Sequence, residues 1–158
     1  MPEMTPDFLV FKRSRFGTRL PTRLRYTKSH YWVLQMSEGV WRIGFTKFAT
    51  RMLGDMVEFQ FEPQPGDGIE LGQKVGSVEG FKAISDIYSV ASGTFATSNG
   101  LLRDDITLIE SDPYGDGWLY EVQGNPEPDL MDASGYAIIL NTTIDKLLAG
   151  RHDAGADE

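Results

Sequence analysis

Turn-forming residues divide the middle of the chain into short apolar segments, and this division is the strongest constraint on the fold. Segments 31–36 and 40–45 flank the tripeptide Ser37–Gly39, and the second alternates large apolar side chains with small or polar ones. Alternation on both sides of a short turn predicts a pair of antiparallel strands. Further strands are expected at 57–61, 74–79, 83–88, 93–97 and 118–122. Closely spaced strands predict a mostly β fold, a compact barrel or sandwich, rather than alternating β/α units.

Two segments have helical spacing instead. Thr46 is a candidate N-cap, apolar side chains follow at positions 48, 49, 52 and 53, and Gly54 is a candidate stop, so a short internal helix is expected. From about Asp132, apolar residues recur at helical intervals as far as Leu148, which predicts an amphipathic C-terminal helix. The small and charged residues 150–158 are expected to form a flexible tail.

Length and charge limit the classes of function. The 158 residues, 41% of them hydrophobic, suffice for one domain with its own core. No apolar run approaches the ~20 residues of a membrane span, and the acids and prolines of residues 1–7 do not resemble a secretory signal, so a cytoplasmic protein is expected. Residues 29–158 carry eight basic and 21 acidic side chains, a net charge of −13. A body this acidic disfavours nucleic acid and anionic membranes and suits docking on basic partner surfaces.

The first 25 residues form a basic N-terminal arm. Residues 1–28 hold seven basic and two acidic side chains, against the acidic remainder. An organelle-targeting segment is one interpretation, but Pro21 interrupts it and acids precede it. RNA binding by the arm alone is a second interpretation. We expect a surface strand or arm that folds back on the acidic body.

Few side chains are suited to chemistry. The chain has no cysteine and two histidines. Ser85, Asp86 and His30 could be arranged as a hydrolytic triad, but the sequence has no Gly-x-Ser-x-Gly elbow. The turn Asp112–Gly117 lacks the spacing of a calcium loop, and no phosphate-binding glycine pattern precedes a helix. No metal site and no catalytic group are predicted.

Lys82 is the remaining candidate. It lies in the short break between the strands predicted at 74–79 and 83–88, with Glu79 three residues before it and Asp86 four residues after it. A lysine at a hairpin tip is presented to a modifying enzyme, and a rigid, protruding tip suits an arm that visits several active sites. Acylation would change the net charge from −8 to −9.

Five stretches, in order, carry a resemblance to a known family. They are Tyr26–Val33, Gly44–Ala49, Leu53–Val57, Gly76–Asp86 and Asp112–Trp118. They resemble the patterns Tyr-Thr-x-x-His-Glu-Trp-Val, Gly-Ile-Thr-x-x-Ala, Leu-Gly-Asp-Ile-Val, Gly-x-Val-Glu-Ser-Val-Lys-Ala-x-Ser-Asp and Asp-Pro-Tyr-Gly-x-Gly-Trp of the glycine cleavage system H protein, a lipoyl carrier.

The resemblance implies a lipoyl/biotinyl-type barrel-sandwich hybrid, with residues 26–149 as a single lipoyl-carrier domain. It implies a non-catalytic protein with lipoic acid attached to Lys82, and with Glu79 and Asp86 as flanking recognition or cleft residues. The implied partners are a lipoate ligase or lipoyl synthase system, a dihydrolipoamide dehydrogenase, and the glycine cleavage P and T proteins.

Four positions depart from the family pattern. Tyr31 replaces a glutamate that faces the amine-loaded arm, Phe81 replaces a valine beside the anchor, Lys47 stands where an acid is common, and Val90 where a proline is common. Losing a carboxylate and gaining a lysine disfavours an amine cargo and favours an anionic or thiol-derived one. Tyr31 is therefore expected to influence which chemical group the arm carries.

Three interpretations stay open. The departures favour a carrier similar to the H-like lipoate-binding proteins of sulfur oxidation, with a heterodisulfide-reductase-like complex as partner. The first alternative is a genuine H protein of glycine cleavage that carries the aminomethyl group. The second alternative is an unmodified interaction module that keeps the fold but not the arm.

Overall fold

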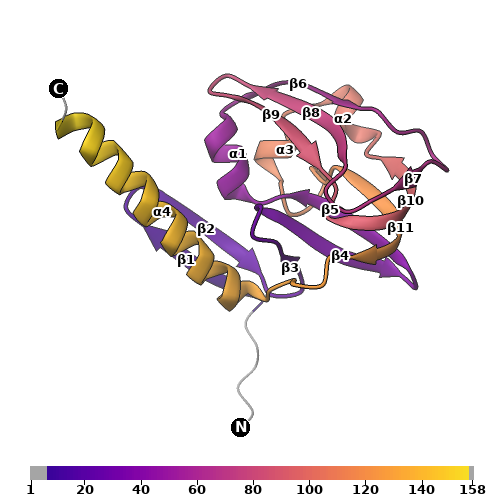
Figure 1. Ribbon diagram of the computed structural model, residues 1–158, viewed down its shortest axis with the longest axis horizontal. Helices are drawn as coiled ribbons and strands as arrows, with labels where there is room; N and C mark the ends of the chain where they lie inside the picture. Colours follow the sequence, from indigo (N-terminus) through magenta and orange to yellow (C-terminus); the bar gives the residue numbers. More distant parts are fainter. Residues whose placement is uncertain (1–6, 157–158) are drawn as a thin grey trace, which may run out of the picture.

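The computed structural model describes residues 7–156 and is built mainly of β-strands (Figure 1). The strands of the described residues are β1 (Phe8–Arg13), β2 (Phe16–Pro21), β3 (Arg25–Tyr26), β4 (Tyr31–Ser37), β5 (Val40–Phe45), β6 (Met56–Phe61), β7 (Gly68–Ile69), β8 (Lys74–Gly80), β9 (Ile84–Tyr88), β10 (Ala91–Ser98) and β11 (Tyr120–Pro126). The helices are α1 (Lys47–Leu53), α2 (Leu101–Asp104), α3 (Leu108–Ser111) and α4 (Ala133–Ala156). The mostly β fold class is therefore confirmed.

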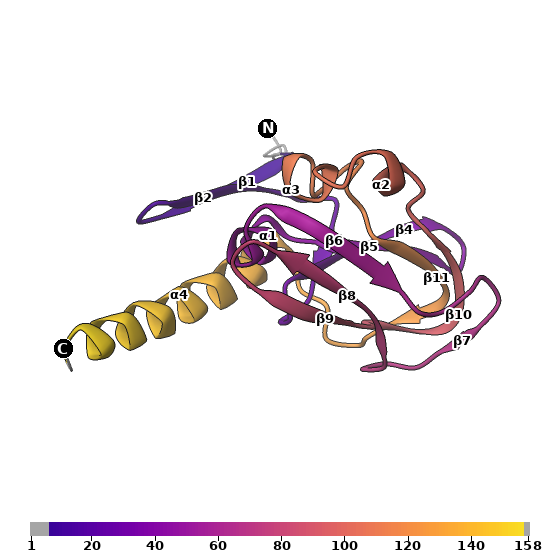
Figure 2. The same cartoon turned by 90° about the horizontal axis from the view of Figure 1, so that it is seen from above.

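Two antiparallel sheets form the body. One has the order β3-β4-β5-β11-β10-β7, and the other has the order β6-β8-β9. The sheets share the main core, in which Ile43, Phe95 and Val122 of the larger sheet pack with Val78 and Ile87 of the smaller one. Figure 2 shows the smaller sheet lying across the larger. This arrangement is consistent with the expected barrel-sandwich hybrid.

The N-terminal residues form a separate hairpin beside α4. Strands β1 and β2 pair in register from Phe8 opposite Pro21 to Arg13 opposite Phe16. The hairpin and α4 lie side by side at one end of the molecule (Figures 1 and 2). Their apolar faces form a second core cluster together with residues of the body: Phe11, Phe16, Leu20, Leu24, Tyr26, Trp32, Phe48, Ala133, Tyr136, Leu140 and Ile144.

Helix α1 begins and ends where the sequence predicts. The Thr46 hydroxyl accepts a hydrogen bond from the Ala49 amide at 3.4 Å, as an N-cap does. Gly54 follows the last helical residue with φ +81°, and its amide donates to the Thr50 carbonyl at 3.0 Å. The left-handed region suits glycine, because glycine has no Cβ to clash there.

Other boundaries differ from the predictions. No local signal in the sequence predicts α2 and α3, which have four residues each. Strand β11 extends through Asn125 and Pro126, beyond the strand predicted at 118–122, because the two residues still pair with β10. Helix α4 continues past Gly150 to Ala156. The flexibility of residues 150–158 stays a prediction, and residues 157 and 158 lie outside the described part of the chain.

Within residues 7–156, no helix is both long and apolar enough to cross a membrane. Among residues 7–150, whose side chains the structure describes, no group of three or more potential metal-ligating side chains occurs.

Candidate functional site

Lys82 lies at the tip of the β8–β9 hairpin, and the backbone of this tip is fixed at several points. The Gly80 amide donates to the Ala83 carbonyl at 2.9 Å and closes the turn. The amide of Phe81 donates to the Asp55 carbonyl, and that of Lys82 to the Leu53 carbonyl, each at 2.9 Å. The turn between α1 and β6 therefore holds the tip in place from outside its own sheet.

Glycines make this close contact possible. A Cβ at Gly80 would lie 2.1 Å from the Leu53 carbonyl oxygen. A Cβ at Gly54 would lie 2.9 Å from Lys82 Cγ and 3.1 Å from its amide nitrogen. Real Cβ atoms essentially never approach a neighbour to within 3.0 Å. The sequence Leu53-Gly-Asp55 is thus a local requirement for seating the Lys82 tip.

The Lys82 side chain is exposed and lies along α1. Its ammonium group donates to the Arg51 carbonyl at 3.4 Å. It lies beside a groove of about 300 Å³, here called the lysine groove. The lining residues are Lys47, Thr50, Arg51, Gly54, Asp55, Phe81, Lys82 and Glu110. Four of them fall at helical spacing and form one face of α1 and its C-terminal turn.

Large apolar side chains surround the tip without being buried. Phe81 is 82% exposed and Ile84 is 72% exposed. Exposed apolar residues of this size beside a presented lysine are typical of a surface that other proteins contact.

Glu79 and Asp86 lie away from the lysine groove. The Asp86 carboxylate pairs with the Lys74 ammonium at 3.4 Å and accepts a hydrogen bond from the Tyr88 hydroxyl at 3.1 Å. Glu79 pairs in register with Ile84 and lines a small hollow on the β6-β8-β9 sheet. The acids that do lie in the groove are Asp55 and Glu110. Sequence reasoning missed them, because their meeting with Lys82 depends on contacts between distant segments.

Tyr31 is part of the main core. Its ring stacks on Phe45 with centroids 5.2 Å apart, and its hydroxyl accepts a hydrogen bond from the Tyr88 amide at 3.3 Å. Burial raises the pKa of Tyr31 to about 12, so its hydroxyl is neutral at physiological pH. Tyr31 is not among the residues that line the lysine groove. Its predicted influence on a carried group stays a prediction.

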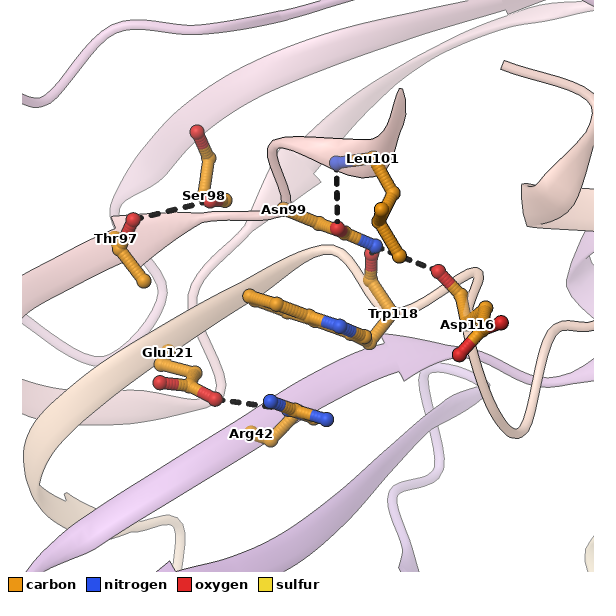
Figure 3. A network of polar contacts seen from close by, with 8 residues as sticks. All are labelled: Arg42, Thr97, Ser98, Asn99, Leu101, Asp116, Trp118 and Glu121. Carbon is orange, nitrogen blue, oxygen red and sulfur yellow. Dashed lines mark hydrogen bonds and ion pairs between the residues drawn. The ribbon is translucent and has the colours of Figure 1, made fainter. Parts of the chain in front are cut away.

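The turn Asp112–Gly117 is held in place by Asn99. Figure 3 shows Asn99 between two segments: its amide group donates to the Asp116 and Trp118 carbonyls at 2.7 and 2.8 Å, and its oxygen accepts from the Leu101 amide at 3.0 Å. Arg42 forms an ion pair with Glu121, and its guanidinium group stacks on the indole ring of Trp118.

Tyr114 connects this turn to the site. Its hydroxyl accepts a hydrogen bond from the Lys47 amide at 3.0 Å and shares one with the Thr18 hydroxyl at 3.1 Å. The turn therefore positions the start of α1 and β2 together.

Comparison with known proteins decides the family. The family model described as "Glycine cleavage H-protein" matches residues 24–142. The chain belongs to the glycine cleavage H-protein family. The glycine cleavage system H protein of Alteromonas mediterranea is 38% identical over 122 residues, which cover 75% of this chain and 94% of the relative. That of Shewanella denitrificans is 37% identical over 125 residues, or 77% of this chain and 96% of the relative.

A solved structure agrees with this assignment. The crystal structure of the H protein from Mycobacterium marinum superposes with a TM-score of 0.67 at 37% identity, covering 75% of this chain and 96% of that one. Glycine cleavage H proteins are non-catalytic carriers with a lipoyl group on a lysine. The exposed lysine, its fixed backbone and the adjacent groove fit such a group. The matched region leaves out residues 7–23 and 143–156 of the described chain.

Proposed function

We propose that this protein carries a lipoyl group on Lys82 and transfers bound intermediates and reducing equivalents between partner enzymes. The main support is the anchored tip: the backbone of Phe81 and Lys82 is hydrogen-bonded to the α1–β6 turn while the lysine side chain stays exposed. The lipoyl group supplies a disulfide that can be reduced to two thiols, a chemistry that a chain without cysteine otherwise lacks.

The protein's own residues would present the arm. The rigid tip keeps the attachment point at a constant position, so that a long arm can reach separate active sites. Phe81 and Ile84 give partner enzymes an apolar surface beside the anchor. Glu79 and Asp86 flank the tip on its strands, where the attaching enzyme, a lipoate ligase or lipoyl synthase system, would read them. A cytoplasmic location belongs to the same proposal.

Intact mass spectrometry tests the attachment. The protein is expressed in a host with an active lipoylation system, and a single lipoyl addition is expected on the wild type. The Lys82→Arg variant should lose this addition completely. Lys74→Arg, the same change at the other end of β8, should keep it. A wild type that never gains the mass would leave the unmodified interaction module as the better interpretation.

Glycine cleavage is the better supported pathway. Its support is the family match and the similarity to named glycine cleavage H proteins. In this role the carrier takes an aminomethyl group at the P protein, passes it to the T protein, and is reoxidised by dihydrolipoamide dehydrogenase. The expected result is loading of the lipoylated protein by P protein and glycine, with the Alteromonas mediterranea relative as positive control.

A sulfur-oxidation role with a heterodisulfide-reductase-like complex is the second candidate. One observation favours it: the position of the family's glutamate is occupied by Tyr31, which is neutral and buried. A neutral phenol cannot attract a protonated amine as a carboxylate does. Loading by P protein at the rate of the positive control would exclude this candidate, and no loading of the fully lipoylated protein would favour it.

A further inference from the structure

A second groove lies beside the N-terminal hairpin and shares two lining residues with the lysine groove. This second groove, here called the hairpin groove, has a volume of about 400 Å³. On the hairpin side its lining residues are Phe8, Thr18, Arg19, Pro21 and Arg23. On the other side they belong to the segment 110–115. Both grooves share Lys47 and Glu110, so they adjoin at the start of α1.

The Lys82 side chain already points in this direction. The side chain lies across Gly54, and its ammonium group reaches the carbonyl of Arg51. Arg51 lies between Gly54 and Lys47 on α1. Lys47 and Gly54 are seven residue steps apart, a distance of about 10 Å along the helix. A lysine extended by a lipoyl chain has about a dozen bonds of ~1.5 Å, a reach on the order of 14 Å. The far end of such an arm can therefore lie in the hairpin groove.

The cations of the hairpin groove are held in place without being neutralised. Arg19 lies over the Phe8 ring, 4.7 Å from its centroid, and Arg23 donates to the Tyr114 carbonyl at 3.3 Å. Among the residues that the structure describes, the ion pairs involve Arg13, Arg42 and Lys74. Neither groove arginine has an acidic partner there.

The two acids of the hairpin groove accept hydrogen bonds from backbone amides. Glu110 accepts from the Met56 amide at 3.3 Å, and Asp112 accepts from the Asp116 amide at 2.8 Å. With Lys47 at the junction, three cations face these two acids, which gives the lining of the groove a net charge of +1. The groove therefore favours a negatively charged group.

We propose that the hairpin groove receives the far end of the loaded arm, and that Arg19 and Arg23 select an arm bearing an anionic substituent over a neutral or cationic one. The proposal rests on the lipoyl-carrier function, and of the two candidate pathways it agrees with the second rather than with an aminomethyl cargo. It adds a selective element from outside the matched region, since both arginines precede residue 24. A carboxylate or another anion on the arm would pair with the two guanidinium groups, which are suited to planar oxyanions.

The absence of cysteine allows a direct test. Lipoylated protein is reduced, and its only thiols, those of the arm, are alkylated with iodoacetate, iodoacetamide or bromoethylamine. The three products bear anionic, neutral and cationic ends. Intact mass verifies two additions in each case and none on Lys82→Arg. Amide chemical shifts of 15N-labelled protein then report where each end lies.

The anionic form is expected to shift the amides of residues 18–20, 22, 23, 47 and 114, and the cationic form is not. In Arg19→Gln/Arg23→Gln the equilibrium constant for docking of the arm should fall about fivefold per arginine, as for a well-formed exposed ion pair. Lys12→Gln/Arg15→Gln, with the same charge loss on the same hairpin but outside the groove, should keep the shifts. Equal shifts for all three forms, or none, would overturn the proposed selection while leaving the carrier intact. A protein that gains no lipoyl mass would overturn both.

Discussion

The backbone of Gly80 packs directly against the backbone of Leu53, with no space for a side chain between them. Because a Cβ there would lie 2.1 Å from the Leu53 carbonyl oxygen, Gly80→Ala must displace the Lys82 tip from the α1–β6 turn. We expect a loss of about 2 kcal/mol or more in the free energy of unfolding, by denaturant titration, together with slower lipoylation. Gly68→Ala is the matched control, since a Cβ added at Gly68 would meet only open space within 4 Å. Full lipoylation and unchanged stability of Gly80→Ala would contradict this account.

His30 predicts a pH dependence of stability. Its ring nitrogen is hydrogen-bonded to the Tyr136 hydroxyl at 2.8 Å, and burial lowers the pKa of His30 from 6.5 to about 4. Between these values the unfolded chain binds a proton that the folded chain does not, so stability falls as the pH drops from about 6.5 towards 4. The full shift corresponds to at most ~3 kcal/mol.

The matched variant is His30→Asn. His30 has φ +73°, and asparagine tolerates this left-handed conformation better than most residues. Denaturant titrations at pH 7 and pH 4.5 should show a smaller loss of stability on acidification in the variant than in the wild type. An identical loss in both proteins would assign the acid sensitivity to carboxylates instead.

Tyr31 shows the limit of sequence reasoning at this scale. The motif comparison gives the residue that stands in place of the family's glutamate, but not where its side chain lies. The ring is buried, because it packs on Phe45 and closes the main core. A tyrosine at an alternating strand position fits either face, and tertiary packing decides between them.

At the scale of elements, Asn99 connects β10, α2 and the turn before β11 (Figure 3). It is 2% exposed and uses both ends of its amide group. Asn99→Asp would place a carboxylate oxygen against two carbonyl oxygens, and we expect a cost of about 2–4 kcal/mol in denaturant titrations. Asn125→Asp makes the same change at an exposed position of β11 and should cost little. Equal effects would mean that charge, rather than the lost donors, is responsible.

The sequence predicts elements where a local signal exists. Alternation located the central strands, and Thr46 with Gly54 located α1. Helices α2 and α3 were missed because single turns have no periodic face, and tertiary contacts of Leu102 and Ile109 stabilise them instead. The lysine groove was missed for a related reason: it requires α1, the tip and Glu110 of α3 to meet in space.

At the scale of the whole molecule, the basic arm is part of the folded structure from Phe8 onwards. Residues 8–21 form a hairpin whose Phe11, Phe16 and Leu20 are buried against α4 and the body. Arg13 reinforces the contact by donating to the Asn141 carbonyl at 2.8 Å and pairing with Asp145. The charge asymmetry of the sequence indicated an arm that folds back, but a hairpin requires pairing between β1 and β2 that charge does not specify.

Removal of residues 1–23 tests how far the carrier depends on this hairpin. The truncation uncovers apolar side chains of α4 and the body, among them Leu140 and Ile144. Three large side chains at about 2 kcal/mol each give a loss of about 6 kcal/mol, or roughly 12–24 °C in the melting temperature. Lipoylation of Lys82 should persist, because the tip is anchored to the α1–β6 turn rather than to the hairpin.

Two substitutions in the full chain compare a buried side chain of the hairpin with an exposed one. Leu20→Ala, at a fully buried position, should cost about 2–4 kcal/mol. Val10→Ala, at a position 73% exposed, should cost under about 0.5 kcal/mol. A truncated protein that melts with the wild type would make the hairpin an independent appendage, and one that folds but is not lipoylated would place part of the recognition surface on the hairpin. The combination expected here, lower stability with lipoylation intact, separates what supports the carrier's fold from what presents its arm.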